Sequence, residues 1–285
     1  DSGKYIRKYG ATFIDYREPE PIHFEFANGL DSDHSFAFEV PREEFDQDRK
    51  AVVQRALDAG VSKFFIPAID SQYTQRMLDL EAEFPAQVFL MMGLHPTHVK
   101  ENVAEELAQV KAWLDKRKFY AVGEIGIDLY WDSTYLKQQQ EAFRTQIQWA
   151  KERKMPINIH CRNAFDEVFE ILEEEKGADL FGIFHCFTGT LQQAKKALSY
   201  NLKLGIGGVV TFKNGKIDQF LNEIPLSEIV LETDAPYLAP TPFRGKRNES
   251  SYLENVVGKL VDIYGISADE IAQITSQNAA AIFGV

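Results

Sequence analysis

The feature that most constrains the fold is an alternation that starts near residue 45 and continues toward the C-terminus. Short apolar runs rich in Val, Ile and Phe alternate with longer amphipathic stretches. This alternation is typical of repeated strand–helix units that build a parallel sheet. The apolar runs predict strands at seven positions, which are Lys63–Ile69, Gln87–Gly93, Tyr120–Glu124, Ile157–His160, Phe181–Phe187, Lys203–Ile206 and Ile229–Thr233.

The amphipathic stretches predict helices between and after these strands. Those that accompany the strands are Asp46–Ala59, Gln72–Glu83, Ala104–Lys116, Leu136–Lys154, Ala164–Glu175, Leu191–Ser199 and Ile217–Leu221. Three more follow at Leu253–Tyr264, Ser267–Ser276 and Asn278–Phe283. Since no Pro/Gly-rich linker divides residues 45–285, we predict one α/β domain over that range.

The length of 285 residues suits a single (β/α)8 TIM-type barrel, which needs about 250 residues. Its eighth strand must come from residues 1–44, which we treat as an N-terminal extension that includes the first strand. Alternation in residues 13–16 and 22–26 indicates a hairpin there, with Asn28-Gly29 as the candidate turn. A doubly wound open sheet is the alternative, and we rank it second because no Gly-rich dinucleotide loop follows an early strand.

Charge and composition narrow the class of protein. The net charge of −12 lacks the basic footprint of a protein that coats duplex DNA. A nucleic-acid substrate would therefore be held locally, at a terminus or on a single strand. The two cysteines form no CxxC pair, which favours a reducing compartment, and we find neither a signal peptide nor a run of about 18 apolar residues. We expect a cytoplasmic monomer that does not contact membranes.

Four polar residues each end an apolar strand: Glu124, His160, His185 and Asp234. The C-terminal ends of barrel strands face the same side, where active sites are built, so we expect these side chains to converge. Two imidazoles and two carboxylates suit Zn, Mn or Mg. Each residue alone has an ordinary explanation, such as a hydrogen-bonded histidine or a helix N-cap at Asp234. Their matching positions favour a centre of one or two divalent ions, with Glu124 and Asp234 as the catalytic carboxylates.

Cationic side chains are predicted near the same face. Arg162 follows a candidate ligand, and the loop 243–248 carries Arg244, Lys246 and Arg247. Guanidinium and ammonium groups there suit phosphate oxygens, although a solvated charge cluster is the alternative interpretation. His95, just past a strand, is predicted to contact substrate.

Several motifs resemble the TatD family of hydrolases, within the wider group of metal-dependent amidohydrolases. The resemblance runs from Glu44 to Val285. It implies a (β/α)8 barrel, a mono- or binuclear metal centre, and hydrolysis of DNA phosphodiesters from the 3′ end of single strands. The matching stretches are Gly93-Leu94-His95-Pro96, Gly123-Glu124-Ile125-Gly126-Ile127-Asp128, Ile159-His160-Cys161-Arg162, Phe184-His185-Cys186-Phe187, Glu232-Thr233-Asp234-Ala235-Pro236-Tyr237-Leu238, Arg244-Gly245-Lys246-Arg247-Asn248 and Asn278-Ala279.

The resemblance also implies roles for single residues. Glu124 takes the position of a carboxylate shared between two metals, and His160 and His185 complete one metal site. Asp234 serves the other site and orients or deprotonates the water.

One departure concerns the first strand. The family usually opens with Asp-x-His-x-His, whereas residues 31–38 offer only His34, and Phe36 stands where a second histidine is expected. The first strand therefore offers the first metal only one of the two usual imidazoles, that of His34.

Three functions fit these observations. The first is a metal-dependent exonuclease acting on DNA. The second is a hydrolase of an ester, amide or lactone that uses the same centre, because a fold does not fix its substrate. The third, motivated by the departure at the first strand, is a non-catalytic binding or scaffold protein.

Overall fold

The computed structural model describes residues 11–12, 23–24, 34–37 and 43–285. Within these residues, eight parallel strands lie side by side in chain order. Strands β3 to β5 form one sheet and β6 to β10 form another, and a parallel bridge between Met92 and Val122 joins them. The strands are β3 (His34–Ala37), β4 (Val61–Ile66), β5 (Val88–Leu90), β6 (Val122–Asp128), β7 (Ile157–Arg162), β8 (Gly182–Phe184), β9 (Leu202–Ile206) and β10 (Ile229–Leu231).

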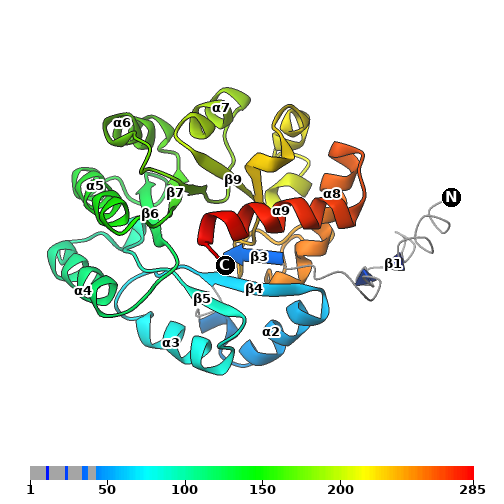
Figure 1. The fold of residues 1–285 in the computed structure, drawn as a ribbon, viewed down its shortest axis with the longest axis horizontal. Helices are drawn as coiled ribbons and strands as arrows, with labels where there is room; N and C mark the ends of the chain where they lie inside the picture. The colour runs from blue at the N-terminus through cyan, green and yellow to red at the C-terminus, as the bar shows by residue number, and fades with distance from the viewer. Residues whose placement is uncertain (1–10, 13–22, 25–33, 38–42) are drawn as a thin grey trace.

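This strand order is that of a (β/α)8 barrel. The last strand, β10, lies next to the first, β3, so the sheet returns to its beginning (Figure 1). A doubly wound sheet would need a reversal in strand order, and the described strands contain none. The predicted barrel is therefore confirmed, and its eighth strand does come from the N-terminal segment.

Helices form the outer ring of the barrel (Figure 1). Each buries an apolar stripe against the strands, as α6 does with Val168, Ile171 and Leu172. The helices of this ring are α2 (Arg49–Asp58), α3 (Thr74–Glu83), α4 (Val103–Lys116), α5 (Leu136–Arg153), α6 (Phe165–Glu175), α7 (Leu191–Ser199) and α8 (Leu253–Tyr264). One more helix, α9 (Ala268–Phe283), ends the chain.

Helix ends follow local sequence signals. Thr190 and Ser267 each open a helix with a capping box, in which the cap hydroxyl accepts from the backbone N–H three residues on. Gly265 ends α8 with a φ of 69°, a left-handed conformation that glycine adopts without the steric cost of a Cβ.

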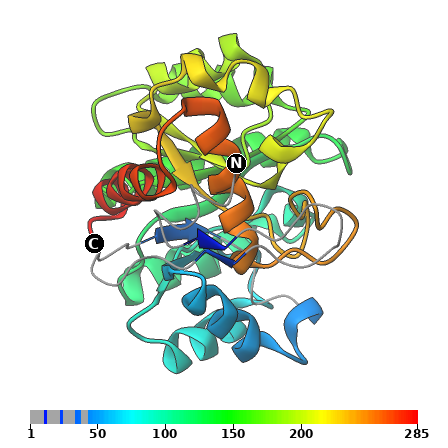
Figure 2. The ribbon, with the colours of Figure 1, turned by 90° about the vertical axis from the view of Figure 1, so that its right-hand side faces the viewer.

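The last helix, α9, closes the N-terminal end of the barrel. A buried cluster joins inward-facing strand residues such as Phe65 and Ile183 to Ile282 and Phe283 of α9. The ring of Phe65 stacks on that of Phe283 at 3.8 Å between centroids. Figure 2 shows α9 at one end of the barrel and the loop that follows β10 at the opposite end. The C-terminal ends of the strands are thereby left as the open face.

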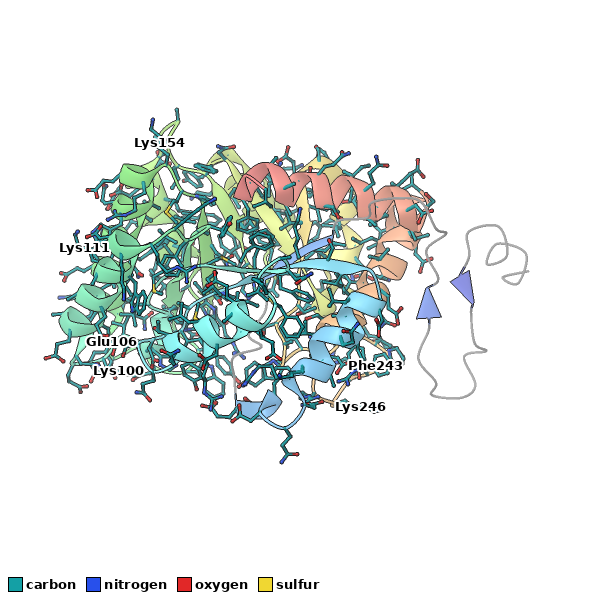
Figure 3. All side chains as sticks on the ribbon, turned by 60° about the horizontal axis from the view of Figure 1, so that its bottom comes forward. Lys100, Glu106, Lys111, Lys154, Phe243 and Lys246 are labelled. Atoms are coloured by element: carbon teal, nitrogen blue, oxygen red, sulfur yellow. The ribbon has the colours of Figure 1, made fainter. Side chains whose placement is uncertain are left out.

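Figure 3 shows the two ends of the barrel from the side. Lys154, at the end of α5, lies at the same end as α9. Lys100, Phe243 and Lys246 lie at the opposite end, where the strands finish.

Two helix predictions were wrong. The segment predicted as a helix at Ile217–Leu221 instead forms short 3-10 turns, η4 (Ile217–Gln219) and η5 (Leu221–Glu223). The two predicted C-terminal helices are one continuous helix, α9, because nothing in residues 276–278 breaks the 3.6-residue period.

The predicted N-terminal hairpin was partly wrong. An antiparallel pair joins β1 (Ala11–Thr12) to β2 (His23–Phe24). The connection between these strands therefore precedes the candidate turn Asn28-Gly29, which itself lies outside the described residues.

Among the described residues, no helix is both long enough and apolar enough to cross a membrane.

Removing the Phe65 ring should destabilise the barrel. Phe65 is fully buried between Phe283 and Phe89, so Phe65→Ala would leave a cavity that the rigid strands cannot close. We expect a loss of about 3–5 kcal/mol in the free energy of unfolding, measured by denaturant titration. Val285→Ala, at an exposed position, is the control. A loss below about 1 kcal/mol for Phe65→Ala would contradict the closure of the barrel end by the packing of Phe65 on α9.

Candidate metal centre

Most side chains of the candidate centre come from the C-terminal ends of strands, but Glu124, which was predicted to end its strand, is the third of the seven residues of β6. Glu124 lies in β6 and His160 in β7, while His185 directly follows β8 and Asp234 follows β10. His95 follows β5 and is the N-cap of the 3-10 helix η2 (Pro96–His98).

One carboxylate oxygen, Oε1 of Glu124, is the centre of this group. His160 Nδ1 lies 2.9 Å from it. The Nε2 atoms of His95 and His185 each lie 3.7 Å from the same oxygen. Glu124 is buried, with a side-chain exposure of 2%, so it needs counter-charge away from water. The imidazoles of His160 and His185, whose pKa values are raised, provide it.

His95, Glu124 and His160 can share one cation. Their ligand atoms all lie within 4.8 Å of one another. Imidazole nitrogen and carboxylate oxygen are suitable donors for Zn or Mn. The residues therefore fit the metal that the sequence predicted, with His95 as a donor that was predicted only to contact substrate.

The pKa values show how strongly these groups interact. Burial and the charge of His160 lower the pKa of His95 to about 4. Burial alone would also lower the pKa of His160, but its hydrogen bonds to Asp128 and Glu124 outweigh burial and raise it to about 9. Burial favours a protonated Glu124, yet the charge of His185 and the hydrogen bonds from His160 and His95 hold its pKa well below the ordinary value. The cluster thus keeps an ionised carboxylate in the protein interior.

A second pair of carboxylates surrounds His185. Its Nδ1 lies 2.6 Å from Glu232 Oε2, and its Nε2 lies 3.2 Å from Asp234 Oδ1. The other Glu232 oxygen accepts a hydrogen bond from the Cys186 backbone N–H at 2.9 Å. Glu232 therefore fixes the ring orientation of His185, in the way that a carboxylate behind a ligand histidine does. This role of Glu232 was not predicted from the sequence. The feature that could have indicated it is the spacing of Glu232 and Asp234, because residues two apart on an extended segment point to the same side.

Asp128 holds His160 in the same way. Its Oδ2 lies 2.8 Å from His160 Nε2, so both ring nitrogens of His160 face carboxylates. Asp128 was quoted only as part of a family motif. It lies four residues after Glu124 in β6, a spacing that alternation places on one side of a strand.

Two buried glutamines of α5 position the strand ends from behind. Gln139 accepts from the Asp128 backbone N–H at 2.9 Å and donates to its carbonyl at 3.2 Å. Gln146 makes the same two bonds with Leu94, at 2.7 and 3.3 Å, directly before His95. These glutamines are seven residues apart and so share one helix face. The sequence analysis missed both, because a glutamine in a helix is usually exposed.

The predicted phosphate-binding cations have different surroundings. Arg244 and Lys246 are exposed, and the Arg244 guanidinium lies 3.5 Å from the centre of the Phe212 ring. Arg162 is exposed at the end of β7. The Arg247 guanidinium instead forms two hydrogen bonds with Asp48, at 2.8 and 2.7 Å. Arg247 is therefore engaged within the protein, while phosphate contact by Arg162, Arg244 and Lys246 stays a prediction.

The thiols of Cys161 and Cys186 are poor metal ligands. Burial raises the pKa of Cys161 to about 12 and that of Cys186 well above its ordinary value. Cys161 packs against the main apolar core. His34 begins β3, but its side chain lies outside the described residues, so its ligand role stays a prediction.

Comparison with known proteins shows which family the chain matches. Residues 37–284 match the family described as TatD related DNase. A Bacillus subtilis (strain 168) protein named uncharacterized metal-dependent hydrolase YabD is 37% identical over 244 residues, which are 85% of this chain and 95% of that protein. The 3'-5' ssDNA/RNA exonuclease TatD of Pantoea vagans is 34% identical over 249 residues, 84% of this chain and 95% of that protein.

Solved structures agree with the fold. The crystal structure of YjjV, a TatD homologue from Escherichia coli K12, superposes with a TM-score of 0.83 and 31% identity, covering 89% of this chain and 98% of that chain. A TatD family hydrolase from Entamoeba histolytica gives 0.78 at 20% identity, covering 88% of this chain and 98% of that chain, and supports the fold alone.

Metal binding should depend on Glu124 and on Asp128 behind it. We expect Asp128→Asn to weaken Mn or Zn binding about 10–100-fold, because His160 loses the carboxylate that orients its ring. Glu124→Gln should weaken binding further, since it removes the negative charge of the ligand carboxylate. Calorimetric titration of protein dialysed against EDTA measures both. Glu106→Gln, a buried glutamate outside this cluster, is the control; equal affinity in all four proteins would refute the assignment.

Gln146→Leu should destabilise the protein by about 1–3 kcal/mol. The substitution leaves the buried N–H and carbonyl of Leu94 without partners. Urea unfolding measures the change, and Gln138→Leu, at an exposed position of the same helix, is the control. If the two variants unfold at the same urea concentration, Gln146 does not have this role.

Proposed function

Because the chain belongs to the TatD-related DNase family, we propose that this metal-dependent hydrolase is an exonuclease that removes nucleotides from the 3′ end of single-stranded DNA. The observation that carries the proposal is the convergence of three imidazoles on Glu124 Oε1. Relatives of similar length are named 3'-5' ssDNA/RNA exonucleases, which supports the choice of substrate and of strand end.

His95, Glu124 and His160 would hold one divalent ion, and His185 with Asp234 would extend the donor set on the other side of Glu124. A bound ion of this kind polarises a phosphate and lowers the pKa of an attacking water. Asp128 and Glu232 keep the two ligand rings in place, so the donors need not reorganise when substrate arrives.

Asp234 is the carboxylate best placed to accept a proton. Its side chain is 26% exposed, whereas that of Glu124 is 2% exposed. A water molecule can therefore reach Asp234, while Glu124 is enclosed by imidazoles. We assign proton transfer from the attacking water to Asp234 and ligand binding to Glu124.

The charge distribution supports a short, local grip on the substrate. The chain carries a net charge of −12, which repels a long polyanion. Exposed cations are nevertheless available at the open face, at Arg162 on the end of β7 and at Arg244 and Lys246 on the loop after β10. A strand terminus needs few phosphate contacts, so it suits this surface better than the middle of a duplex does.

The test is nucleotide release from a single-stranded oligonucleotide with Mg or Mn. We expect nucleotides to leave one at a time from the 3′ end, and EDTA to abolish release. Asp234→Asn should lower kcat about 10²–10⁴-fold, because the proton acceptor is lost. Lys111→Gln, on the outer helix α4, is the matched control and should leave the rate unchanged.

Three results would contradict this proposal in different ways. Release from the 5′ end would refute the polarity, and faster cleavage of duplex than of single strands would refute the substrate. Metal-dependent hydrolysis of a carboxylic ester or lactone, with no nucleotide released, would favour the alternative hydrolase.

A further inference from the structure

Two large aromatic side chains lie exposed next to the metal centre. Trp131 is 69% exposed and Tyr130 is 52% exposed, which makes them the two most exposed large apolar side chains among the described residues. A single exposed apolar residue needs no explanation, but two adjacent rings at the rim of a candidate active site do. They lie two and three residues after Asp128, in the loop after β6.

The two rings and one arginine form a compact group. The centroids of Tyr130 and Trp131 lie 4.9 Å apart with their planes at 88°. The Arg162 guanidinium lies 3.8 Å from the centroid of Tyr130 and 5.4 Å from that of Trp131. Arg162 is the last residue of β7, so neighbouring strands β6 and β7 provide the group together.

Asp128 connects this group to the metal centre. Its Oδ1 accepts hydrogen bonds from the backbone N–H groups of Tyr130 and Trp131, at 3.0 and 3.1 Å. Its Oδ2 is the atom that lies 2.8 Å from His160 Nε2. One carboxylate therefore fixes both a candidate metal ligand and the backbone that carries the rings.

The rest of the loop is also held. Asp132 accepts from the Thr134 backbone N–H at 2.8 Å and pairs with Lys100 at 3.3 Å. The Tyr135 hydroxyl donates to Glu101. These contacts tie the loop to the segment before α4, so the rings are presented by an ordered backbone.

We propose that Tyr130, Trp131 and Arg162 form a stacking platform for an unpaired base of the substrate strand. The proposal rests on the proposed function and names the part of the substrate that this site recognises. An exposed indole offers a flat face on which any base can stack, and such stacking is the usual way in which proteins bind single strands without sequence preference. Arg162 adds a positive charge beside the rings that attracts the adjoining phosphate.

The platform also selects between single and double strands. The faces of a base inside a duplex are covered by its neighbours, so stacking on Trp131 requires an unpaired or frayed end. A protein partner fits less well, because two rings flanked by Arg162 and Asp132 form a patch smaller than a stable protein interface needs.

Tryptophan fluorescence tests binding separately from cleavage. The other two tryptophans, Trp113 and Trp149, are partly buried, so stacking should quench mainly Trp131. The probe is oligo(dT) with phosphorothioate linkages, added with Mn and, separately, with EDTA. With Mn, with EDTA or with both, we expect the oligonucleotide to quench the fluorescence of the native chain and of Trp113→Phe to saturation. Trp131→Phe should lose most of this quenching. Equal quenching in Trp131→Phe, or none in any protein, would overturn the platform.

An abasic series tests whether the ring contacts a base. Single-stranded substrates carry one abasic residue at each of the first four positions from the 3′ end. At one position we expect the KM of the native chain to rise five- to tenfold with little change in kcat. Trp131→Ala should have this raised KM already with the intact substrate, and the abasic substrate should raise its KM no further. Additive effects of the two changes would contradict stacking.

Arg162 has a matched control at the opposite end of the neighbouring strand, β6. Lys118 lies 4.3 Å from the centre of the Tyr120 ring, before β6 begins. We expect Arg162→Gln to raise KM and Lys118→Gln to leave it unchanged. Cleavage that proceeds normally in Trp131→Ala and Arg162→Gln would refute the platform and leave the exonuclease in place. Trp131-dependent quenching without any cleavage would refute the exonuclease and leave the platform.

Discussion

The ionised side chain of Glu124 is the group on which the rest of the centre depends. A carboxylate that is 1% exposed loses nearly all of its hydration, so the protein must supply partners of opposite charge. It does so with the charged imidazoles of His160 and His185, while His95, whose pKa is lowered, adds a neutral ring from a third strand end. The side chains can meet because the strands pack closely, and glycines allow this close packing. A Cβ at Gly123 would collide with Asn158 on β7, and a Cβ at Gly93 would press on Gly123. The barrel thus brings β5, β6 and β7 near enough for their terminal side chains to meet.

Each imidazole in the centre is held by a partner of its own. Asp128 contacts His160, Glu232 contacts His185, and the Thr97 backbone N–H donates to His95 Nδ1 at 3.2 Å. Gly205 belongs to the same arrangement, because a Cβ there would collide with the carboxylate of Glu232. The ligand groups are therefore oriented before any ion binds, which lowers the reorganisation that binding requires.

The open face keeps positive charge on a protein that is acidic overall. Arg247 is neutralised by Asp48 and stabilises the packing of the loop after β10 against the segment before α2. Arg162 and Arg244 instead rest on aromatic rings, which hold a guanidinium in place without cancelling its charge. Positive charge is thus kept at the rim of the centre, while most of the surface discourages extended contact with nucleic acid.

The sequence alone determined the barrel and the kinds of side chain at its open end. Strand and helix periods are local properties of the chain, and parallel strands must place their C-terminal ends together, so Glu124, His160, His185 and Asp234 could be predicted to converge. The tertiary structure decided which further residues join them. His95 enters from a loop, Gln139 and Gln146 act from α5, and Arg247 turns to Asp48, a residue 199 positions away. Such contacts depend on how loops and distant elements pack, and no local period in the sequence records them.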